Sequence, residues 1–281
     1  MGCDVMKRMV VSMSNIFYSI QRYFVVFWRY LRLALQVRLA YRASFFAEFS
    51  INVLSAVSSL LFIEFLYANI PAVAGWSHDE ALVILASYFI IQSISWLFLM
   101  SGMWRFDYML RIGSFDRMLV RPMHPLALIG FSEIQPETVV DFSLALFLLG
   151  RYVFLYSFPP VWIIILYILF LFFGVVILLS FLVILRTINF KTINTWSISI
   201  FVQDISNFGR YPRQIFQGKL FRFLAATILP VVFMGAVPAE IFLGKVDWWY
   251  VVFGFLTAAV FFLSARFLWN RALKSYSSAS S

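Results

Sequence analysis

The chain has 281 residues, of which 63% are hydrophobic, 20% aromatic and 12% charged, and its net charge is +9. An ordinary soluble domain has about 45–50% apolar and about 25% charged residues, so this chain has too few polar side chains to cover a soluble surface. The composition therefore excludes a soluble globular domain, a disordered chain and a nucleic-acid-binding protein. A single cysteine excludes a disulfide framework and a cysteine-based metal cluster, and no metal site is predicted.

Residues 1–43 are predicted to form a cytoplasmic N-terminus and an amphipathic helix that lies in the membrane interface. In 14–36 the polar side chains share one face of a helix: Arg22, Arg29, Arg32 and Gln36. The large apolar side chains share another: Phe24, Trp28, Leu31 and Leu35. Arg38 and Arg42 point elsewhere, so a bend near 36–38 is expected. A simple basic anchor that sets the topology explains this pattern equally well. Residues 1–13 lack an apolar h-region, so no cleavable signal peptide is expected.

Residues 44–270 are predicted to form an all-α domain with six membrane spans, since about 20 apolar residues cross a hydrocarbon core of about 30 Å. The predicted spans are 45–68, 81–104, 130–156, 161–185, 190–208 and 248–269. The span 161–185 carries no charge and is the clearest. The fifth span is ambiguous, because 223–243 could replace 190–208, but the count is six in both cases. The runs are continuous, whereas barrel strands would alternate over about 10 residues.

The distribution of lysine and arginine predicts the orientation of these spans. Basic residues are frequent before the first span, in the loop 105–125 and after the last span, and the loop 69–80 has none. We therefore expect the loop 69–80 outside the cell and the loop 105–125 inside. Both termini, including the tail 271–281, are expected in the cytoplasm, with the protein in the plasma (inner) membrane.

The sequence contains no recognisable catalytic motif. The phosphate-binding GxxxxGK pattern, HExxH, GxSxG and CxxC are all missing from the printed sequence. His78 and His124 lie in loops, so neither is expected to activate a nucleophile within a span. No catalytic residue is therefore predicted, and energy for any driven work would come from a partner or an ion gradient.

Two stripes of polar residues lie on predicted spans, each within an 80° arc of a helix. The first stripe comprises Ser44, Glu48, Asn52, Ser55 and Ser59, and the second comprises Thr192, Thr195, Ser199, Gln203 and Ser206. Polar groups in a membrane face other helices or water, so hydrogen bonding between helices and a transport path are both consistent with the stripes. Glu48 favours a path, because an ionisable residue in a span is functional by default. The alternatives are a salt bridge to Arg42 or Arg38, or solvation at the cytoplasmic rim.

The loop 105–125 mixes apolar and charged residues in a way that is typical of a docking surface for a cytosolic protein. Gly113 and Ser114 predict a turn between two short helices. Asp116 is expected to cap the second helix or to pair with Arg117 or Arg121. The candidate docking residues are Arg111, Ile112, Gly113, Ser114, Phe115, Asp116 and Arg117.

At this point the chain resembles a known family. The segment RIGSFDRMLVRPMHPL (111–126) resembles the G-x-(L/F)-D-x-x-L-x-R-P stretch of ABC exporter permeases of the type-2 (ABC-2) class. The segment 211–245 resembles a second motif of the branch whose permeases are about as long as this chain and pair with a separate ATPase. The matching residues of that motif are Tyr211, Pro212, Pro230, Pro238 and Gly244. The resemblance covers essentially all of 14–275.

The resemblance implies a six-span permease with an interfacial connecting helix and a re-entrant outer hairpin over 211–245 before the last span. It implies that two permeases, identical or related, form a dimer, and that each docks a cytosolic ATP-binding subunit through the loop between spans two and three. Spans one, two and five would line the path. ATP and Mg would bind the partner, so no cofactor is expected in this chain. The hairpin would place Arg210, Arg213, Lys219 and Arg222 outside, which is acceptable where such a hairpin is buried among protein.

The predicted function is the transport step of an ATP-driven exporter for hydrophobic or amphiphilic compounds, as in multidrug efflux. Glu48 and Glu64 near aromatic residues suggest a lipophilic cation as substrate. An alternative is an ion-coupled carrier or channel without an ATPase, in which Glu48, Asp141 and Asp204 bind the ion, although the internal repeats common in such carriers are not evident. A third hypothesis is a purely structural membrane subunit.

Overall fold

A computed structural model describes residues 2–190, 196–215 and 218–276. Within these ranges the chain is helical, and its only β-type pairing is an isolated bridge between Val73 and Trp76. Five helices of the described chain are long and apolar enough to cross a membrane: Arg42–Asn69, His78–Arg111, Pro136–Leu155, Val161–Phe190 and Trp248–Lys274. The prediction of an all-α, multi-pass membrane protein is therefore confirmed.

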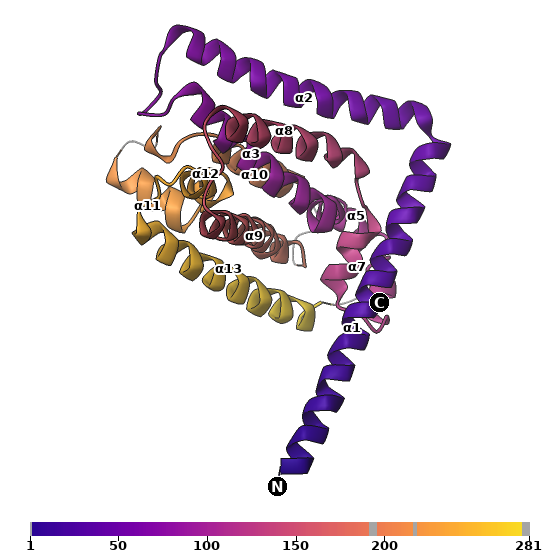
Figure 1. Cartoon of the computed structure of the whole chain (residues 1–281). Coiled ribbons are helices and arrows are strands. Elements are labelled where there is room, and N and C mark those ends of the chain that lie inside the picture. Colours follow the sequence, from indigo (N-terminus) through magenta and orange to yellow (C-terminus); the bar gives the residue numbers. More distant parts are fainter. Residues whose placement is uncertain (1, 191–195, 216–217, 277–281) are drawn as a thin grey trace.

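The first two helices meet at a sharp bend. Helix α1 (Gly2–Ala40) lies across one end of the bundle, and α2 (Arg42–Asn69) turns away from it to run along the other spans (Figure 1). The bend is at Tyr41, where φ is −106° and ψ is 59°, and not at 36–38 as predicted. The helix continues through Arg38, whose side chain pairs with two carboxylates on neighbouring elements, Glu48 and Glu137. On the apolar face of α1, the side chains of Phe24 and Trp28 are exposed, because no other part of the described chain covers them.

The second span begins with a capping box. Ser77 and Glu80 bond reciprocally at the start of α3 (His78–Ser95), which stabilises the first turn of the helix. The span continues through a π-helical turn (Trp96–Met100), α4 (Ser101–Trp104) and α5 (Phe106–Arg111). It is therefore longer than the predicted segment 81–104.

The third span differs from the prediction at its start. The predicted segment 130–156 is divided into α7 (Pro125–Ser132) and α8 (Val139–Leu155), with a short 3₁₀ turn at 136–138 between them. Proline lacks an N–H and disfavours helical geometry in the residue before it, and Gln135 is accordingly extended. The span therefore begins at Pro136, and Glu133 lies in the break between the two helices.

Helix α7 packs against the second span at backbone contact distance. A Cβ atom added to Gly130 would lie 1.9 Å from the Phe98 carbonyl oxygen, and one added to Gly102 would lie 1.9 Å from the Ile129 carbonyl oxygen. Only glycine fits at these two crossings. The close approach fixes α7 beside the C-terminal half of the second span.

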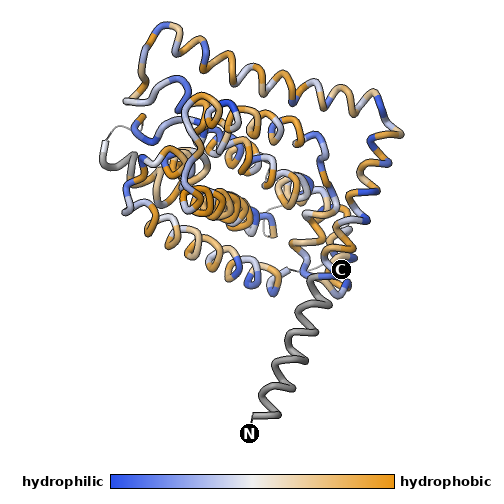
Figure 2. Tube along the Cα trace, viewed as in Figure 1, coloured by the Kyte–Doolittle hydropathy of each residue, from blue (hydrophilic) through white to orange (hydrophobic). Residues whose placement is uncertain are grey.

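The core of the molecule consists of the second span and α9 (Val161–Arg186), which are mostly buried. Helices α2, α8 and α13 (Trp248–Lys274) surround them and expose most of their apolar residues. Figure 2 shows hydrophobic residues running along these helices, with hydrophilic residues gathered at the connections. This arrangement is expected where lipid, which is itself apolar, covers the outer helices.

The segment after α9 contains shorter helices. Helix α10 (Trp196–Asn207) is the described part of the predicted span 190–208, and the count of six spans stays a prediction. In the predicted hairpin 211–245, α11 (Lys219–Thr227) precedes α12 (Ala236–Phe242), which is buried against α3 and α9. Figure 1 places α11 and α12 at the same end of the bundle as the loop that follows α2. This placement suits a re-entrant hairpin, which also stays a prediction.

Candidate functional site

The predicted docking loop forms a tight turn between two short helices. Helix α5 ends at Arg111, and α6 (Asp116–Leu119) follows the turn. Gly113 has a φ of +65°, which a residue with a Cβ adopts only with strain. The turn and both flanking helices are therefore confirmed. Ser114 closes the turn by donating a hydrogen bond to the Met109 carbonyl at 3.2 Å.

An aromatic cluster anchors this loop to the C-terminal end of α13. The Phe115 side chain is 0% exposed and packs edge-on against rings from three other elements: Phe106, Phe190, Trp269 and Tyr276. The Tyr276 hydroxyl donates a hydrogen bond to the Asp116 carboxylate at 2.9 Å. Asp116 therefore bonds a residue that is distant in the sequence, and its expected pairing with Arg117 or Arg121 stays a prediction. Movement of the loop would pull directly on α13.

The opposite side of the loop is exposed. Val120 is 84% exposed and Ile112 is 54% exposed, and Arg111 and Arg117 are exposed beside them. Apolar and basic groups together on one outward surface are typical of a protein interface. We call these four residues the docking surface.

A buried ion pair connects the loop to α9 and α10. Arg186, at the end of α9, is completely buried and donates to the Asp107 carboxylate of α5 at 2.9 Å. Arg186 also donates to Ser199 of α10, and Asn189 donates to Asp107. A buried charge is tolerated only when it is paired and hydrogen-bonded, so these contacts hold the three elements together.

The first polar stripe is divided between an ion pair and bonds within α2. The Glu48 carboxylate lies 2.5 Å from the Arg38 guanidinium, and Arg38 also lies 2.7 Å from the buried Glu137. This finding favours the salt-bridge alternative for Glu48. Asn52 and Ser59 donate to backbone carbonyls one turn earlier in α2, at Glu48 and Ser55. Ser44 faces Glu48 at 3.5 Å.

The described part of the second stripe faces other helices. Ser199 and Ser206 are completely buried, and Ser206 accepts a hydrogen bond from Gln92 of α3 at 2.7 Å. Gln203 lies one turn from Asn207 on the same helix, with 3.5 Å between their side chains. Hydrogen bonding between helices thus accounts for Ser199 and Ser206, whereas the described contact of Gln203 lies within its own helix. Thr192 and Thr195 lie outside the described residues.

Arg210 joins three of the predicted path elements. Its guanidinium donates to Ser59 of α2 at 3.2 Å, to Tyr88 of α3 at 3.4 Å and to Asn207 of α10 at 2.8 Å. It also lies over the Tyr88 ring, 5.0 Å from the centroid. The Nε atom of Arg210 has no hydrogen-bond partner in the described structure. Arg210 borders a small cavity of about 220 Å³ between α2 and α3, so this end of the predicted path is positively charged. We call these contacts the Arg210 junction.

The predicted hairpin residues pack tightly at the same end of the bundle. Pro212, Pro230 and Pro238 are buried, and Tyr211 packs edge-on against Phe62 of α2. Arg213 pairs with the buried Glu240 at 2.5 Å and lies 3.9 Å from the centroid of the Tyr250 ring. The pairing explains how the basic residue Arg213 is accommodated within a packed segment.

Ion pairs also close this end of the bundle beside the hairpin. Lys245 lies 2.6 Å from Glu80, Arg151 lies 3.0 Å from Asp79, and His78 lies 3.0 Å from Glu64. Of the two acidic residues that suggested a cationic substrate, Glu48 thus pairs with Arg38, and Glu64 contacts a histidine that is charged only when protonated.

The carboxylates proposed for an ion-coupled carrier do not form one site. Glu48 pairs with Arg38, Asp204 is exposed on α10, and Asp141 lies on α8. Among the residues that the structure describes, no group of three or more acidic, histidine or cysteine side chains is placed to hold a metal ion.

Several residues of these sites were not identified from the sequence. Three of them carry buried charges: Asp107, Arg186 and Glu137. The role of each charge is recognisable only when its partner in the fold is known. Arg186 directly follows the uncharged run 161–185, and no motif marks it in the sequence. Its complete burial depends on α5 and α10, which no local pattern placed beside it.

The comparison with protein families agrees with this architecture. The family model described as an ABC-2 family transporter protein matches residues 53–280, which is well over half of the chain. No curated protein and no solved structure matches the chain. Members of this family are the membrane-embedded subunits of ABC transporters and work with an ATP-binding subunit. The chain belongs to the ABC-2 transporter family, as a multi-pass permease subunit.

Proposed function

We propose that this permease is half of an ATP-driven exporter in the plasma (inner) membrane, with both termini in the cytoplasm. A cytosolic ATP-binding subunit docks on the loop between the second and third spans, and a second permease, identical or related, completes the path. ATP and Mg bind the partner, and this chain supplies no catalytic residue. The observation that carries the proposal is the two-sided loop, which is exposed at Val120 and anchored at Phe115.

The anchored side of the loop gives a route for coupling. Phe115 and Asp116 contact the end of α13, and Asp107 contacts Arg186 of α9. Arg186 in turn contacts Ser199 of α10. A displacement of the loop by the ATP-binding subunit would therefore move α13, α9 and α10 together and change access to the path between protomers.

The substrate class we propose is a hydrophobic or amphiphilic compound. The ion pair between Glu48 and Arg38 weakens the case for a cationic drug-like substrate, because the charge of this carboxylate is already balanced. Arg210 instead places a positive charge at the junction of α2, α3 and α10, where its described partners are the neutral side chains of Ser59, Tyr88 and Asn207, which favours a substrate whose polar end is anionic. Export of cationic and anionic dyes, measured for the wild type, Glu48→Gln and Arg210→Gln, distinguishes these choices.

The docking role is tested by matched charge reversals. The tagged permease is purified from its native membrane as the Arg117→Glu or the Arg271→Glu variant. The ATPase activity of the ATP-binding subunit that co-purifies with it is then measured. Both residues are exposed arginines, Arg117 on α6 and Arg271 in the last turn of α13, but only Arg117 belongs to the docking surface. We expect Arg117→Glu to lose the co-purifying ATPase and Arg271→Glu to keep it.

Two loop variants extend this test to coupling. Gly113→Pro and Asp116→Lys are expected to abolish stimulation of the ATPase while the chain still inserts into the membrane. Equal ATPase recovery for all variants and for the wild type would contradict the docking role. Export that continues without any ATP-binding subunit would instead favour the ion-coupled alternative.

A further inference from the structure

A cavity of about 730 Å³ lies between α1, α7, α9 and α13 at the end of the bundle where α1 crosses it. Its wall is mostly apolar, with Leu99, Leu179 and Val183 from the second span and α9. Its rim is polar and carries Tyr23 of α1, Asn270 and Arg266 of α13, and His124 before α7. The cavity thus has an apolar interior and a polar rim.

Arg266 gives this rim a positive charge. No ion pair or hydrogen bond engages the Arg266 side chain in the described chain, and no carboxylate is among the residues that line the cavity. Burial, and secondarily the charge of Arg266, lowers the pKa of His124 below its ordinary value, so His124 is neutral at pH 7. Its Nδ1 atom accepts a hydrogen bond from the Leu126 N–H at 3.3 Å. Arg266 is therefore the charge that an occupant of the cavity would meet.

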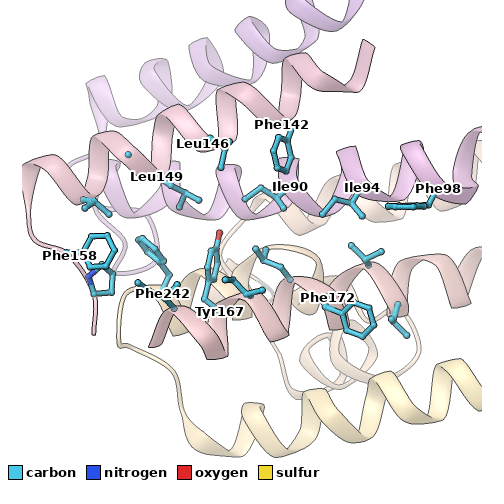
Figure 3. A pocket seen from close by; sticks show the side chains of 18 of the residues that line it. Ile90, Ile94, Phe98, Phe142, Leu146, Leu149, Phe158, Tyr167, Phe172 and Phe242 are labelled. Atoms are coloured by element: carbon cyan, nitrogen blue, oxygen red, sulfur yellow. The ribbon is translucent and has the colours of Figure 1, made fainter. Parts of the chain in front are cut away.

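The cavity adjoins a second hollow, the apolar groove between α8 and α9. Val176 and Leu179 of α9 line both the cavity and a second hollow of about 810 Å³ between α8 and α9. Figure 3 shows Phe142 and Leu146 of α8 facing Phe172 of α9 across this hollow. The hydroxyl of Tyr167, the polar group that projects here, is already bonded to Ser87 at 3.1 Å. The groove is therefore suited to a hydrocarbon chain.

The dimensions also fit one leaflet of a bilayer. Fifteen residues of helix rise separate Val183 from Ile168, which is about 22 Å at 1.5 Å per residue. Half of a hydrocarbon core of about 30 Å is roughly 15 Å. A chain that starts beside Val183 therefore reaches the middle of the membrane within the groove.

We propose that this cavity binds an anionic phospholipid, with its phosphate at Arg266 and an acyl chain in the groove between α8 and α9. The charge complementarity selects the headgroup, because a basic pocket between spans at the membrane interface attracts anionic lipids. The lipid would fill the space between α7, α9 and α13, next to the helices that the docking loop contacts. The proposal does not depend on which side of the membrane this end of the bundle faces.

The test measures lipid that stays with the full-length permease. The protein is reconstituted in an equal mixture of phosphatidylglycerol and phosphatidylcholine and extracted in mild detergent, and the lipid retained per chain is quantified by mass spectrometry. The wild type is expected to retain phosphatidylglycerol in excess. Arg266→Gln is expected to reduce that excess about fivefold, the equivalent of about 1 kcal/mol for one basic residue near an anionic group. Arg271→Gln removes the same charge from the same helix outside the cavity and is expected to change nothing.

Two further variants keep the result interpretable. Arg266→Lys is expected to retain most of the excess, which separates loss of charge from loss of fold. Ala127→Phe, which fills the cavity, is expected to reduce retention of both lipids. Equal retention of the two lipids by the wild type, or equal losses in Arg266→Gln and Arg271→Gln, would overturn the proposal. Displacement of the lipid by inorganic phosphate alone would assign the site to a free anion and would also overturn it.

Discussion

The buried pair Asp107–Arg186 gives the sharpest prediction about stability. Asp107→Ala leaves the Arg186 guanidinium buried without its carboxylate, and removing one partner of a buried pair costs about 3–5 kcal/mol. Because about 1.4 kcal/mol is a factor of ten in an equilibrium constant, the unfolding equilibrium is expected to shift by more than a hundredfold. Denaturant titration of the purified permease measures this shift.

The control for this prediction is an exposed ion pair, that of Arg105 with Glu133. Arg105 lies 2.5 Å from Glu133, but its side chain is 56% exposed, and exposed pairs contribute about 0–1 kcal/mol. Glu133→Ala is therefore expected to cost less than about 1 kcal/mol. Equal losses of stability for Asp107→Ala and Glu133→Ala would refute the assignment of Arg186 as a buried charge that depends on Asp107.

A double variant separates stability from coupling. Asp107→Leu combined with Arg186→Met replaces the pair by apolar groups, which is often neutral or stabilising. We expect this variant to recover most of the lost stability. It also removes the contact between the loop and α10, so stimulation of the ATPase is expected to stay low. Full recovery of stimulation would show that the pair serves the fold alone.

Three shorter predictions follow from the packing. Gly130→Leu places a side chain where a Cβ alone would lie 1.9 Å from the Phe98 carbonyl, so the variant is expected to aggregate on size-exclusion chromatography. Phe115→Ala empties a fully buried site and is expected to cost about 3–5 kcal/mol in a denaturant titration, with weaker ATPase stimulation. In a cysteine-free background, Ile215→Cys is expected to react with an impermeant thiol reagent from the same side as Ile70→Cys. Labelling of the two positions from opposite sides would contradict the outer hairpin.

Composition and continuous hydrophobicity were sufficient to predict the fold class and most of the spans. The burial of α9 and the exposure of α2 both follow from packing, which a run of apolar residues does not reveal. The break before α8 was visible in principle, because Pro136 forbids a regular helix there. It was missed because the segment 130–156 is apolar enough as a whole to suggest one span.

The features of the candidate sites differ in how far the sequence predicts them. The turn of the predicted docking loop was identified from local sequence, since Gly113 and Ser114 favour a turn. The anchoring of Phe115 and the bond from Tyr276 to Asp116 were not predictable, because they join residues separated by 160 positions. The first polar stripe and the described part of the second lie on helices as predicted, but periodicity alone does not distinguish a path from the contacts that Ser199 and Ser206 make.

The most direct test of the central claim is cross-linking between the docking surface and the ATP-binding subunit in native membranes. Val120→Cys and Ile70→Cys are prepared in a cysteine-free background and treated with a short thiol-to-amine cross-linker. Both positions are exposed, at 84% and 43%, and they lie at opposite ends of the second span. The account predicts a cross-link to the ATP-binding subunit from Val120→Cys and none from Ile70→Cys. Cross-linking from Ile70→Cys, or from neither position, would contradict it.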